Sequence, residues 1–231
     1  MNDGAFGECE TSESGRYHYQ PPDVPLALLH VDDALIIANK PHGLLSVPGR
    51  GEDRQDCLLS RIRDRYPEAL VVHRLDMDTS GLLLFARGQA MQSALARAFQ
   101  ERQVDKRYEA VLDGLLERDA GKVDLPLIVD WPNRPRQKVD YVIGRRALTR
   151  FRVMQRDSLA RTTRVELEPV TGRSHQLRVH MQSLGHPILG DDLYAGEAAS
   201  RADRLLLHAR DLAFIHPLTA ERVEFHAPPP F

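Results

Sequence analysis

The chain has 231 residues, of which 42% are hydrophobic and 28% are charged, and its formal net charge is −2. This composition excludes a disordered polymer, a collagen-like repeat and a small disulfide scaffold, and it fits one large domain or at most two small ones. The longest apolar runs, such as residues 82–86, are far too short to span a bilayer, and the acidic N-terminus carries no secretory signal, so we expect a cytoplasmic protein without membrane contact.

The N-terminal segment differs from the rest of the chain. Residues 1–24 are rich in Gly, Ser, Glu and Pro and show no apolar period, so they are expected to form an acidic, disordered tail. The fold is expected to occupy residues 25–231. Two apolar runs at 26–31 and 34–38 flank Asp32 and Asp33, and this pattern predicts a hairpin with a tight polar turn. A loop rich in Gly and Pro follows at 40–53.

Helical spacing of apolar residues occurs in three later segments. Steps of four predict one helix over 58–66, which ends before Pro67, and a second over 91–99. A third helix is predicted over 174–185, with Ser174 as its N-cap and Gly185 as its stop signal. Leu177 belongs to the apolar stripe of this helix and is expected in the core.

Short strands are predicted between and after these helices, at 82–86, 108–112, 151–154, 164–170, 205–208, 212–215 and 223–226. The strands outnumber the helices and do not alternate strictly with them. The sequence therefore predicts an α+β fold, with a single domain built on a mixed, mostly antiparallel central β-sheet flanked by helices and bearing a cleft.

The net charge conceals an uneven distribution. Residues 1–24 carry a net charge of −4, which leaves +2 for residues 25–231. Residues 131–152 hold seven basic side chains against the single acid Asp140, a local charge of +6. A solvated basic face explains such a cluster at least as well as a polyanion site does, so charge alone does not decide between them.

Several common site types are missing from the sequence. It contains no GxGxxG, GxxxxGK[ST], HExxH or GxSxG motif. His175 and His180 are five residues apart, about 140° around a helix, so they diverge and do not converge on one metal. Cys9 and Cys57 have no CxxC spacing, and both are expected to be free thiols.

Three segments set charged and polar residues against short apolar runs: 73–81, 105–110 and 171–180. In the first, Arg74 and Asp76 lie just before the predicted strand, and residues 79–81 suit a turn. An Asp that caps a loop and pairs with a nearby Arg is a common structural arrangement. From the residues alone, this structural interpretation is slightly favoured over a catalytic one.

The same segments resemble the motifs of one enzyme family. His73-Arg74-Leu75-Asp76 followed by Thr79-Ser80-Gly81 closely resembles the central motif of the RluA family of pseudouridine synthases, which isomerise uridine in RNA. Residues 40–45 (KPHGLL), 106–110 (KRYEA) and 171–180 (TGRSHQLRVH) are similar to three further family motifs, in family order. Four ordered motifs over some two hundred residues identify the chain as a member.

A further segment resembles one group of members within this family. Residues 123–139 are similar to a segment of the dual-specificity members, which modify tRNA anticodon stem-loops and a hairpin of 23S rRNA. The resemblance thus implies position 32 of tRNA and position 746 of 23S rRNA as targets. Larger relatives carry an N-terminal S4 domain, and none is expected here. The resemblance implies no cofactor or metal, and we expect a monomer.

The resemblance also assigns roles to residues. It implies that Asp76 is the catalytic carboxylate, acting either as a nucleophile or as a base that removes a ribose proton. Arg178 is expected to pair with Asp76, and an opposite charge close by favours an ionised carboxylate. Tyr108 is expected to stack on the target uracil and to relay a proton through its hydroxyl.

The remaining implied residues are expected to bind RNA. Arg74 would occupy the space left by the flipped uridine, since a stacked base is inaccessible to chemistry at C1′ and C5. The other expected RNA contacts are His73, Arg134, Arg136, Lys138, Arg173 and His175. Three alternatives stay open: a family member that acts on rRNA only, a non-catalytic RNA-binding module, and a metal-dependent hydrolase.

Overall fold

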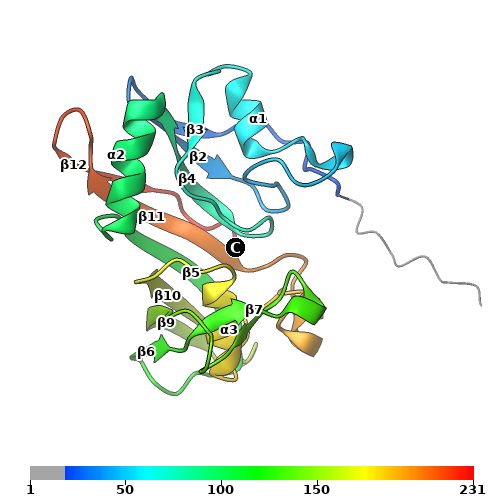
Figure 1. Ribbon diagram of the computed structural model, residues 1–231. Coiled ribbons are helices and arrows are strands. Elements are labelled where there is room, and N and C mark those ends of the chain that lie inside the picture. Colours follow the sequence, from blue (N-terminus) through cyan, green and yellow to red (C-terminus); the bar gives the residue numbers. More distant parts are fainter. Residues whose placement is uncertain (1–18) are drawn as a thin grey trace, which may run out of the picture.

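A ten-stranded mixed sheet runs through the computed structural model, which describes residues 19–231 (Figure 1). The strand order along the main path is β1-β2-β4-β11-β5-β10-β9-β6, and β3 and β12 pair with β4 and β11. The strands are β1 (Leu28–Val31), β2 (Leu35–Lys40), β3 (Ala69–Val71), β4 (Ser80–Arg87), β5 (Asp105–Asp113), β6 (Ala120–Asp124), β9 (Leu148–Asp157), β10 (Thr162–Pro169), β11 (Leu207–Ile215) and β12 (Arg222–His226).

A small hairpin and three α-helices accompany this sheet. The hairpin consists of β7 (Leu127–Val129) and β8 (Gln137–Val139), joined through a short 3-10 helix at Trp131–Asn133. The α-helices are α1 (Leu58–Arg63), α2 (Gln89–Gln100) and α3 (Gln176–Ser183). Within the described residues the pairing of β4 with β11 is parallel, and the other strand pairs are antiparallel. The expected α+β fold with a mostly antiparallel sheet is confirmed.

The helices cover the sheet because side chains alternate between its two faces. In β4, Leu83 and Phe85 pack toward α1, whereas Leu84, on the other face, packs in the cluster that contains Leu95 of α2. Further along the sheet, α3 buries Leu177 and Met181 against β5 and β10. The expected core position of Leu177 is confirmed. Figure 1 shows β1–β4 with α1 and α2 in one part of the molecule and β6, β9, β10 and α3 in the other.

Several element predictions need correction. The runs at 205–208 and 212–215 belong to one strand, β11, which stays continuous through an irregularity between Ala209 and Asp211. Ser174 is not the N-cap of α3, since His175 holds that position with a left-handed φ of 53°. The expected stop at Gly185 agrees with its φ of 78°. Strands β3, β6, β7 and β8 were not predicted.

The expected tail falls largely outside the described residues, which begin at Tyr19. Its last six residues, 19–24, are described, and there Tyr19 is buried at 4% exposure. The Tyr19 hydroxyl donates to the carbonyl of Asp56 and accepts from the N–H of Leu45, both at 3.0 Å. Tyr19 thus packs against the fold, which differs from the expectation for this part of the tail.

None of the helices found in residues 19–231 is long and apolar enough to cross a membrane.

Candidate active site

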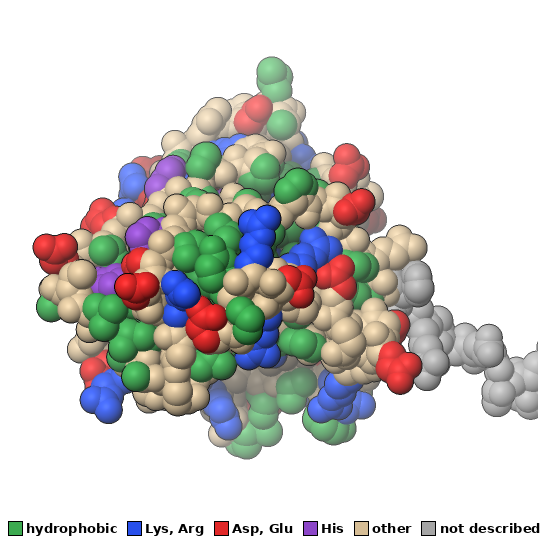
Figure 2. Space-filling view, turned by 90° about the horizontal axis from the view of Figure 1, so that it is seen from above, with side chains coloured by type: hydrophobic (Ala, Val, Ile, Leu, Met, Phe, Trp, Pro, Cys, Tyr) green, Lys and Arg blue, Asp and Glu red, His purple; other side chains and the backbone are tan. Residues whose placement is uncertain are grey.

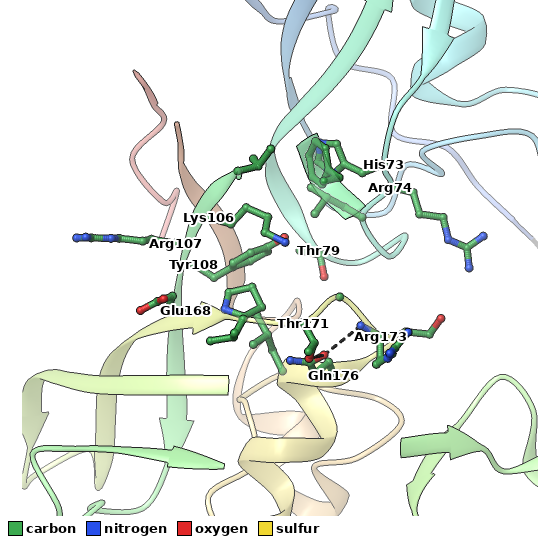
Figure 3. Close-up of a pocket in the computed structure, with 18 of the residues that line it drawn as sticks. His73, Arg74, Thr79, Lys106, Arg107, Tyr108, Glu168, Thr171, Arg173 and Gln176 are labelled. Atoms are coloured by element: carbon green, nitrogen blue, oxygen red, sulfur yellow. Dashed lines mark hydrogen bonds between the residues drawn. The ribbon is translucent and has the colours of Figure 1, made fainter. Parts of the chain in front are cut away.

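A cleft of about 890 Å³ lies between the two parts of the sheet and collects residues from all three motif segments (Figure 3). Its walls come from the loop before β4, from the α2–β5 connection with the first half of β5, and from the loop between β10 and α3. Seven of the ten residues singled out from the sequence line it: His73, Arg74, Asp76, Tyr108, Arg173, His175 and Arg178. Arg134, Arg136 and Lys138 are not among the lining residues.

The loop that carries Asp76 is held by an earlier loop, residues 40–46. The ammonium of Lys40 donates to the carbonyls of Pro41, Leu44 and Met77 at 2.7–2.9 Å. Its side chain is completely buried, and this burial lowers the pKa of Lys40 to about 7. The hydroxyl of Ser46 donates to the carbonyl of Leu75 at 2.7 Å and accepts from its N–H at 3.2 Å. The backbone of Leu75 and of Met77, on either side of Asp76, is therefore held by hydrogen bonds with the side chains of Ser46 and Lys40.

Asp76 itself faces two potential cations and remains partly accessible. Its Oδ2 lies 3.9 Å from Nη1 of Arg178, and its Oδ1 lies 4.0 Å from Nε2 of His175. The Asp76 side chain is 27% exposed. At these separations the carboxylate experiences the positive charge of the guanidinium without a short hydrogen bond to it. A substrate atom can reach the oxygens of Asp76 from the cleft.

Arg178 has a closer partner than the expected one. Its Nε and Nη2 donate to the two carboxylate oxygens of Asp191 at 2.8 and 2.6 Å, and Nη2 also donates to Asp192 at 3.1 Å. Burial by itself disfavours the charged form, but the bonds and charge of Asp191 outweigh it and raise the pKa of Arg178. The expected pairing of Arg178 with Asp76 is thus a secondary, longer contact, and sequence reasoning missed Asp191.

Tyr108 lies on β5, in the middle of the sheet, opposite Leu167 of β10 and Ala209 of β11. Its ring packs against the apolar clusters of both parts of the molecule. Burial, followed by the negative charge of Asp76, raises the pKa of Tyr108. The phenol is therefore neutral at physiological pH and offers a flat apolar face and an O–H group to the cleft (Figure 3).

His73 and Arg74 are neighbours with opposite environments. The ring of His73 stacks on Phe99 with 4.5 Å between centroids, and its Nε2 accepts from the N–H of Leu84 at 3.1 Å. Burial lowers the pKa of His73 to about 3, so this ring is neutral. The side chain of Arg74 is exposed and extends away from its loop (Figure 3), and no partner is found for it within residues 19–231.

The other basic residues lie beside the cleft. Arg173, at the cleft wall, donates from Nε to the carbonyl of Arg146 at 3.2 Å, and its guanidinium stays exposed. On the β7–β8 hairpin, Arg134 stacks on Trp131 at 4.0 Å and Lys138 is exposed. The face in Figure 2 mixes Lys and Arg with Asp and Glu. That face therefore shows no large patch of a single charge sign.

The N-terminus of α3 is arranged around His175. Its left-handed backbone turns the ring so that Nε2 faces Asp76 and Nδ1 lies 2.7 Å from the hydroxyl of Tyr194. Tyr194 is another residue that sequence reasoning missed. His180 differs, because its two nitrogens contact Thr149 and the carbonyl of Leu125 in the interior, so its role is structural. Within residues 19–231, no group of His, Cys, Asp or Glu side chains has the arrangement of metal ligands.

Comparisons with known proteins agree with this geometry. A sequence profile for RNA pseudouridylate synthases matches residues 34–183. The chain is 56% identical over 201 residues to the dual-specificity RNA pseudouridine synthase RluA of Vibrio cholerae, covering 86% of this chain and 81% of the relative. It is 50% identical over 219 residues to the enzyme of the same name from Escherichia coli K12, covering 94% of this chain and 100% of the relative.

Solved structures give the same result. The human RNA pseudouridylate synthase domain containing 1 is similar with a TM-score of 0.75 and 29% identity, over 95% of this chain and 87% of that one. The human RNA pseudouridylate synthase domain containing 4 is similar with a TM-score of 0.71 and 26% identity, over 88% of each chain.

Proposed function

The chain belongs to the RNA pseudouridylate synthase family, and we propose that it converts uridine to pseudouridine in tRNA anticodon stem-loops and in a hairpin of 23S rRNA, with Asp76 as the reacting carboxylate. The reaction breaks the N1–C1′ bond, turns the uracil and rejoins it through C5. Atoms are conserved and no electrons are gained or lost overall. The demands on the protein are therefore a charged group beside the sugar, a pocket that retains the free uracil, and a means of extracting the base.

One observation carries the proposal: a partly exposed carboxylate stands in a cleft of about 890 Å³ with the guanidinium of Arg178 3.9 Å away. Asp76 can attack the nucleoside or remove a ribose proton, and both routes begin from its ionised form. The buried guanidinium stabilises that negative charge when RNA covers the cleft and excludes water. Because Arg178 is fixed by Asp191, it stays in place whatever the charge on Asp76 becomes.

Tyr108 fits the role of a platform for the uracil. Its ring borders the cleft from the centre of the sheet, where the strands β10 and β11 on either side hold its backbone. A neutral phenol can stack on a flat base and exchange a proton through its O–H group. This supports Tyr108 as the residue that retains the detached uracil between bond cleavage and bond formation.

Arg74 fits the role of the residue that displaces the target uridine from the base stack. Arg74 lies two residues before Asp76, its side chain is exposed, and it lines the cleft. A planar cation can enter a base stack and replace the flipped uridine there. His73 contributes indirectly, because its ring is engaged with Phe99 and the backbone of β4 and thereby supports the loop.

The basic side chains around the cleft would hold the RNA backbone. Arg134, Arg136 and Lys138 present their charges on the β7–β8 hairpin, while Arg173 and His175 stand at the cleft wall. Contacts of this kind are electrostatic and do not depend on the RNA sequence. Selection of the target would then rest on loop shape and on flipped-out bases, since side chains cannot read the deep groove of an A-form stem.

The two RNA substrates are proposed from the relatives. Both curated relatives described above bear the words "dual-specificity" in their names, and the chain matches them over most of its length. A synthase that acts on rRNA only is the nearest alternative. Mapping of pseudouridines in tRNA and rRNA from cells that lack this protein separates the two, because the alternative leaves the tRNA modification intact.

The proposed activity can be tested by tritium release from anticodon stem-loop RNA that carries uracil labelled at C5. Formation of the new C5–C1′ bond expels that hydrogen. We expect release by the wild-type protein in the presence of a chelator, and none by Asp76→Ala. A metal-dependent hydrolase would release no tritium, because hydrolysis leaves the C5–H bond intact, and it would instead form hydrolysis products that disappear on chelation. A folded wild-type protein that binds both RNAs and releases no tritium would favour a non-catalytic RNA-binding module.

A further inference from the structure

Tyr194 contacts the β7–β8 hairpin, residues 127–139, on one side and His175, a residue of the cleft wall, on the other. Its side chain is buried, with 5% exposure. It is held in a turn where Oδ1 of Asp191 accepts from the N–H groups of Leu193 and Tyr194 at 3.0 and 3.1 Å. Tyr194 is not among the residues that line the cleft.

The Tyr194 hydroxyl has one partner on each side. It accepts a hydrogen bond of 2.7 Å from the N–H of Gln137, the first residue of β8. On the other side, it lies 2.7 Å from Nδ1 of His175. Within residues 19–231, the Tyr194 hydroxyl has no acceptor other than Nδ1 of His175, so we assign its hydrogen to the bond with that nitrogen. The hydroxyl therefore joins the hairpin to the first turn of α3.

This bond determines which nitrogen of His175 carries the hydrogen. A neutral imidazole that accepts at Nδ1 has its hydrogen on Nε2. Nε2 is the atom that lies 4.0 Å from Oδ1 of Asp76. Burial lowers the pKa of His175, which favours the neutral ring. Tyr194 thus directs an N–H group of His175 toward the carboxylate.

The Tyr194 ring makes a second connection. The guanidinium of Arg178 lies 5.2 Å from the ring centroid, and that of Arg136 lies 5.5 Å from it. Arg136 is exposed on the hairpin, whereas Arg178 is buried beside Asp76. One aromatic ring therefore contacts both a proposed RNA-binding arginine and the arginine that faces the carboxylate.

We propose that Tyr194 is a positioning residue that couples the β7–β8 hairpin to Asp76. Its hydroxyl keeps the Nε2–H of His175 facing the carboxylate, and its ring packs on the guanidinium of Arg178, which Asp191 holds. RNA bound on the hairpin then fixes Tyr194, and through it the ring of His175, for reaction. This inference rests on the proposed function, because it assigns a role to RNA on the hairpin. A tyrosine that serves only the core would affect stability without affecting the rate of the folded enzyme.

The first test compares Tyr194→Phe with Tyr66→Phe. Tyr66 also carries an arginine on its ring, Arg87 at 5.3 Å, but its hydroxyl has no hydrogen bond within the described residues. The measurements are the single-turnover rate at saturating RNA, the Kd for RNA, and urea unfolding. We expect Tyr194→Phe to lower the saturated rate roughly tenfold and to change Kd by less than about twofold. Tyr66→Phe should change neither quantity.

The second test uses exposed residues, so that it does not depend on the folding of a core variant. Arg136→Gln removes the guanidinium that lies over Tyr194, and the control Arg118→Gln removes an exposed guanidinium on the β5–β6 loop, which does not line the cleft. Arg136→Gln should lower the rate at saturating RNA several-fold, and Arg118→Gln should leave it unchanged.

The outcomes separate the inference from the proposed function. An unchanged saturated rate for Tyr194→Phe overturns the coupling, and so do equal saturated rates for Arg136→Gln and Arg118→Gln. If the wild-type protein forms no pseudouridine in either RNA, the proposed function fails and the coupling falls with it. If the wild-type protein is active and these variants react at its rate, the coupling alone is wrong.

Discussion

Arg178 and Asp191 form a two-bond ion pair, 2.8 and 2.6 Å long, in which both side chains are almost fully buried. The same guanidinium stands 3.9 Å from Asp76. Asp191 therefore neutralises the buried guanidinium and determines its orientation. The carboxylate of Asp76 makes no short hydrogen bond to that guanidinium. A carboxylate that is stabilised by charge but not engaged in a tight pair can react with a substrate.

We expect Asp191→Asn to damage both stability and activity. The change leaves a buried guanidinium without its carboxylate, and breaking a buried pair in this way costs about 3–5 kcal/mol. Arg178 would also lose the geometry that places it beside Asp76, which should lower kcat roughly tenfold or more. Urea unfolding and pseudouridine formation at saturating RNA measure the two effects.

The neighbouring acid provides a matched control. Asp192 makes one bond of 3.1 Å to Arg178, but its side chain is 66% exposed. Exposed ion pairs contribute little, so Asp192→Asn should change the free energy of unfolding by less than about 1 kcal/mol. Equal losses for the two variants would show that burial does not distinguish these carboxylates, contrary to the structure.

Gly81→Ala should prevent the close approach of β4 to β11. Gly81 has a φ of 111°, and a Cβ built there would lie 2.3 Å from the carbonyl oxygen of Ala209. Both the backbone strain and the overlap with main-chain atoms oppose an alanine. We expect a loss of at least about 3 kcal/mol in the free energy of unfolding, measured by chemical denaturation.

Gly172 serves as the comparison for this substitution. It has no positive φ, and a Cβ built there would meet nothing within 4 Å. Gly172→Ala should therefore leave the free energy of unfolding within about 0.5 kcal/mol of the wild type. A stable Gly81→Ala protein would contradict the spacing of the two parallel strands.

Asp32 gives a prediction for stability as a function of pH. Burial raises the pKa of Asp32, but hydrogen bonds from His30 and from the N–H groups of Ala34 and Leu35 outweigh it and lower the pKa to about 2 from 3.8. A carboxyl whose pKa is lower in the folded state contributes stability that is present above its unfolded pKa and is lost as the pH falls through its folded pKa. This contribution is thus complete above about pH 4 and disappears toward pH 2.

The matched pair here is Asp32→Ala and Asp33→Ala. Asp33 stands next to Asp32 in the same turn, and its side chain is 100% exposed. At pH 7 we expect Asp32→Ala to be destabilised by about 1–2 kcal/mol and Asp33→Ala to be nearly unaffected. The gap between wild type and Asp32→Ala should narrow as the pH is lowered below 4. A gap that widens on acidification would refute the sign of this linkage.

The fold could be predicted where an apolar pattern is long enough to stand out. The run of five apolar residues at 82–86 indicates β4, the apolar stripe over 91–99 indicates α2, and both elements lie where they were expected. Strands β3, β7 and β8 have three residues each, too few for a period. The sequence predicted two strands in place of β11 because the polar residue Arg210 interrupts the apolar pattern. Arg210 stays in the sheet because Glu109 and Glu166 accept its hydrogen bonds.

Residues of the candidate site could be predicted only where they belong to a family motif. The seven site residues that belong to the family motifs lie in three separate segments, and the structure brings all seven to one cleft. Asp191 and Tyr194 could not be inferred, because an acid after a glycine indicates a turn and a tyrosine indicates a core residue equally well. Their partners, Arg178 and His175, are known only once the chain is folded.

The last prediction concerns the salt dependence of RNA binding. Each Lys or Arg that neutralises a phosphate contributes about 0.7 to 0.9 to the slope of log K against log salt. Replacing Arg134, Arg136 and Lys138 together by Gln should therefore reduce the slope for an anticodon stem-loop by about 2 to 3, with affinity lost most strongly at low salt. Arg118→Gln is the control, since Arg118 is exposed on the β5–β6 loop and does not line the cleft. If the triple variant keeps the wild-type slope, the backbone contacts lie elsewhere, because a loss of charge at a phosphate contact must release fewer counterions on binding.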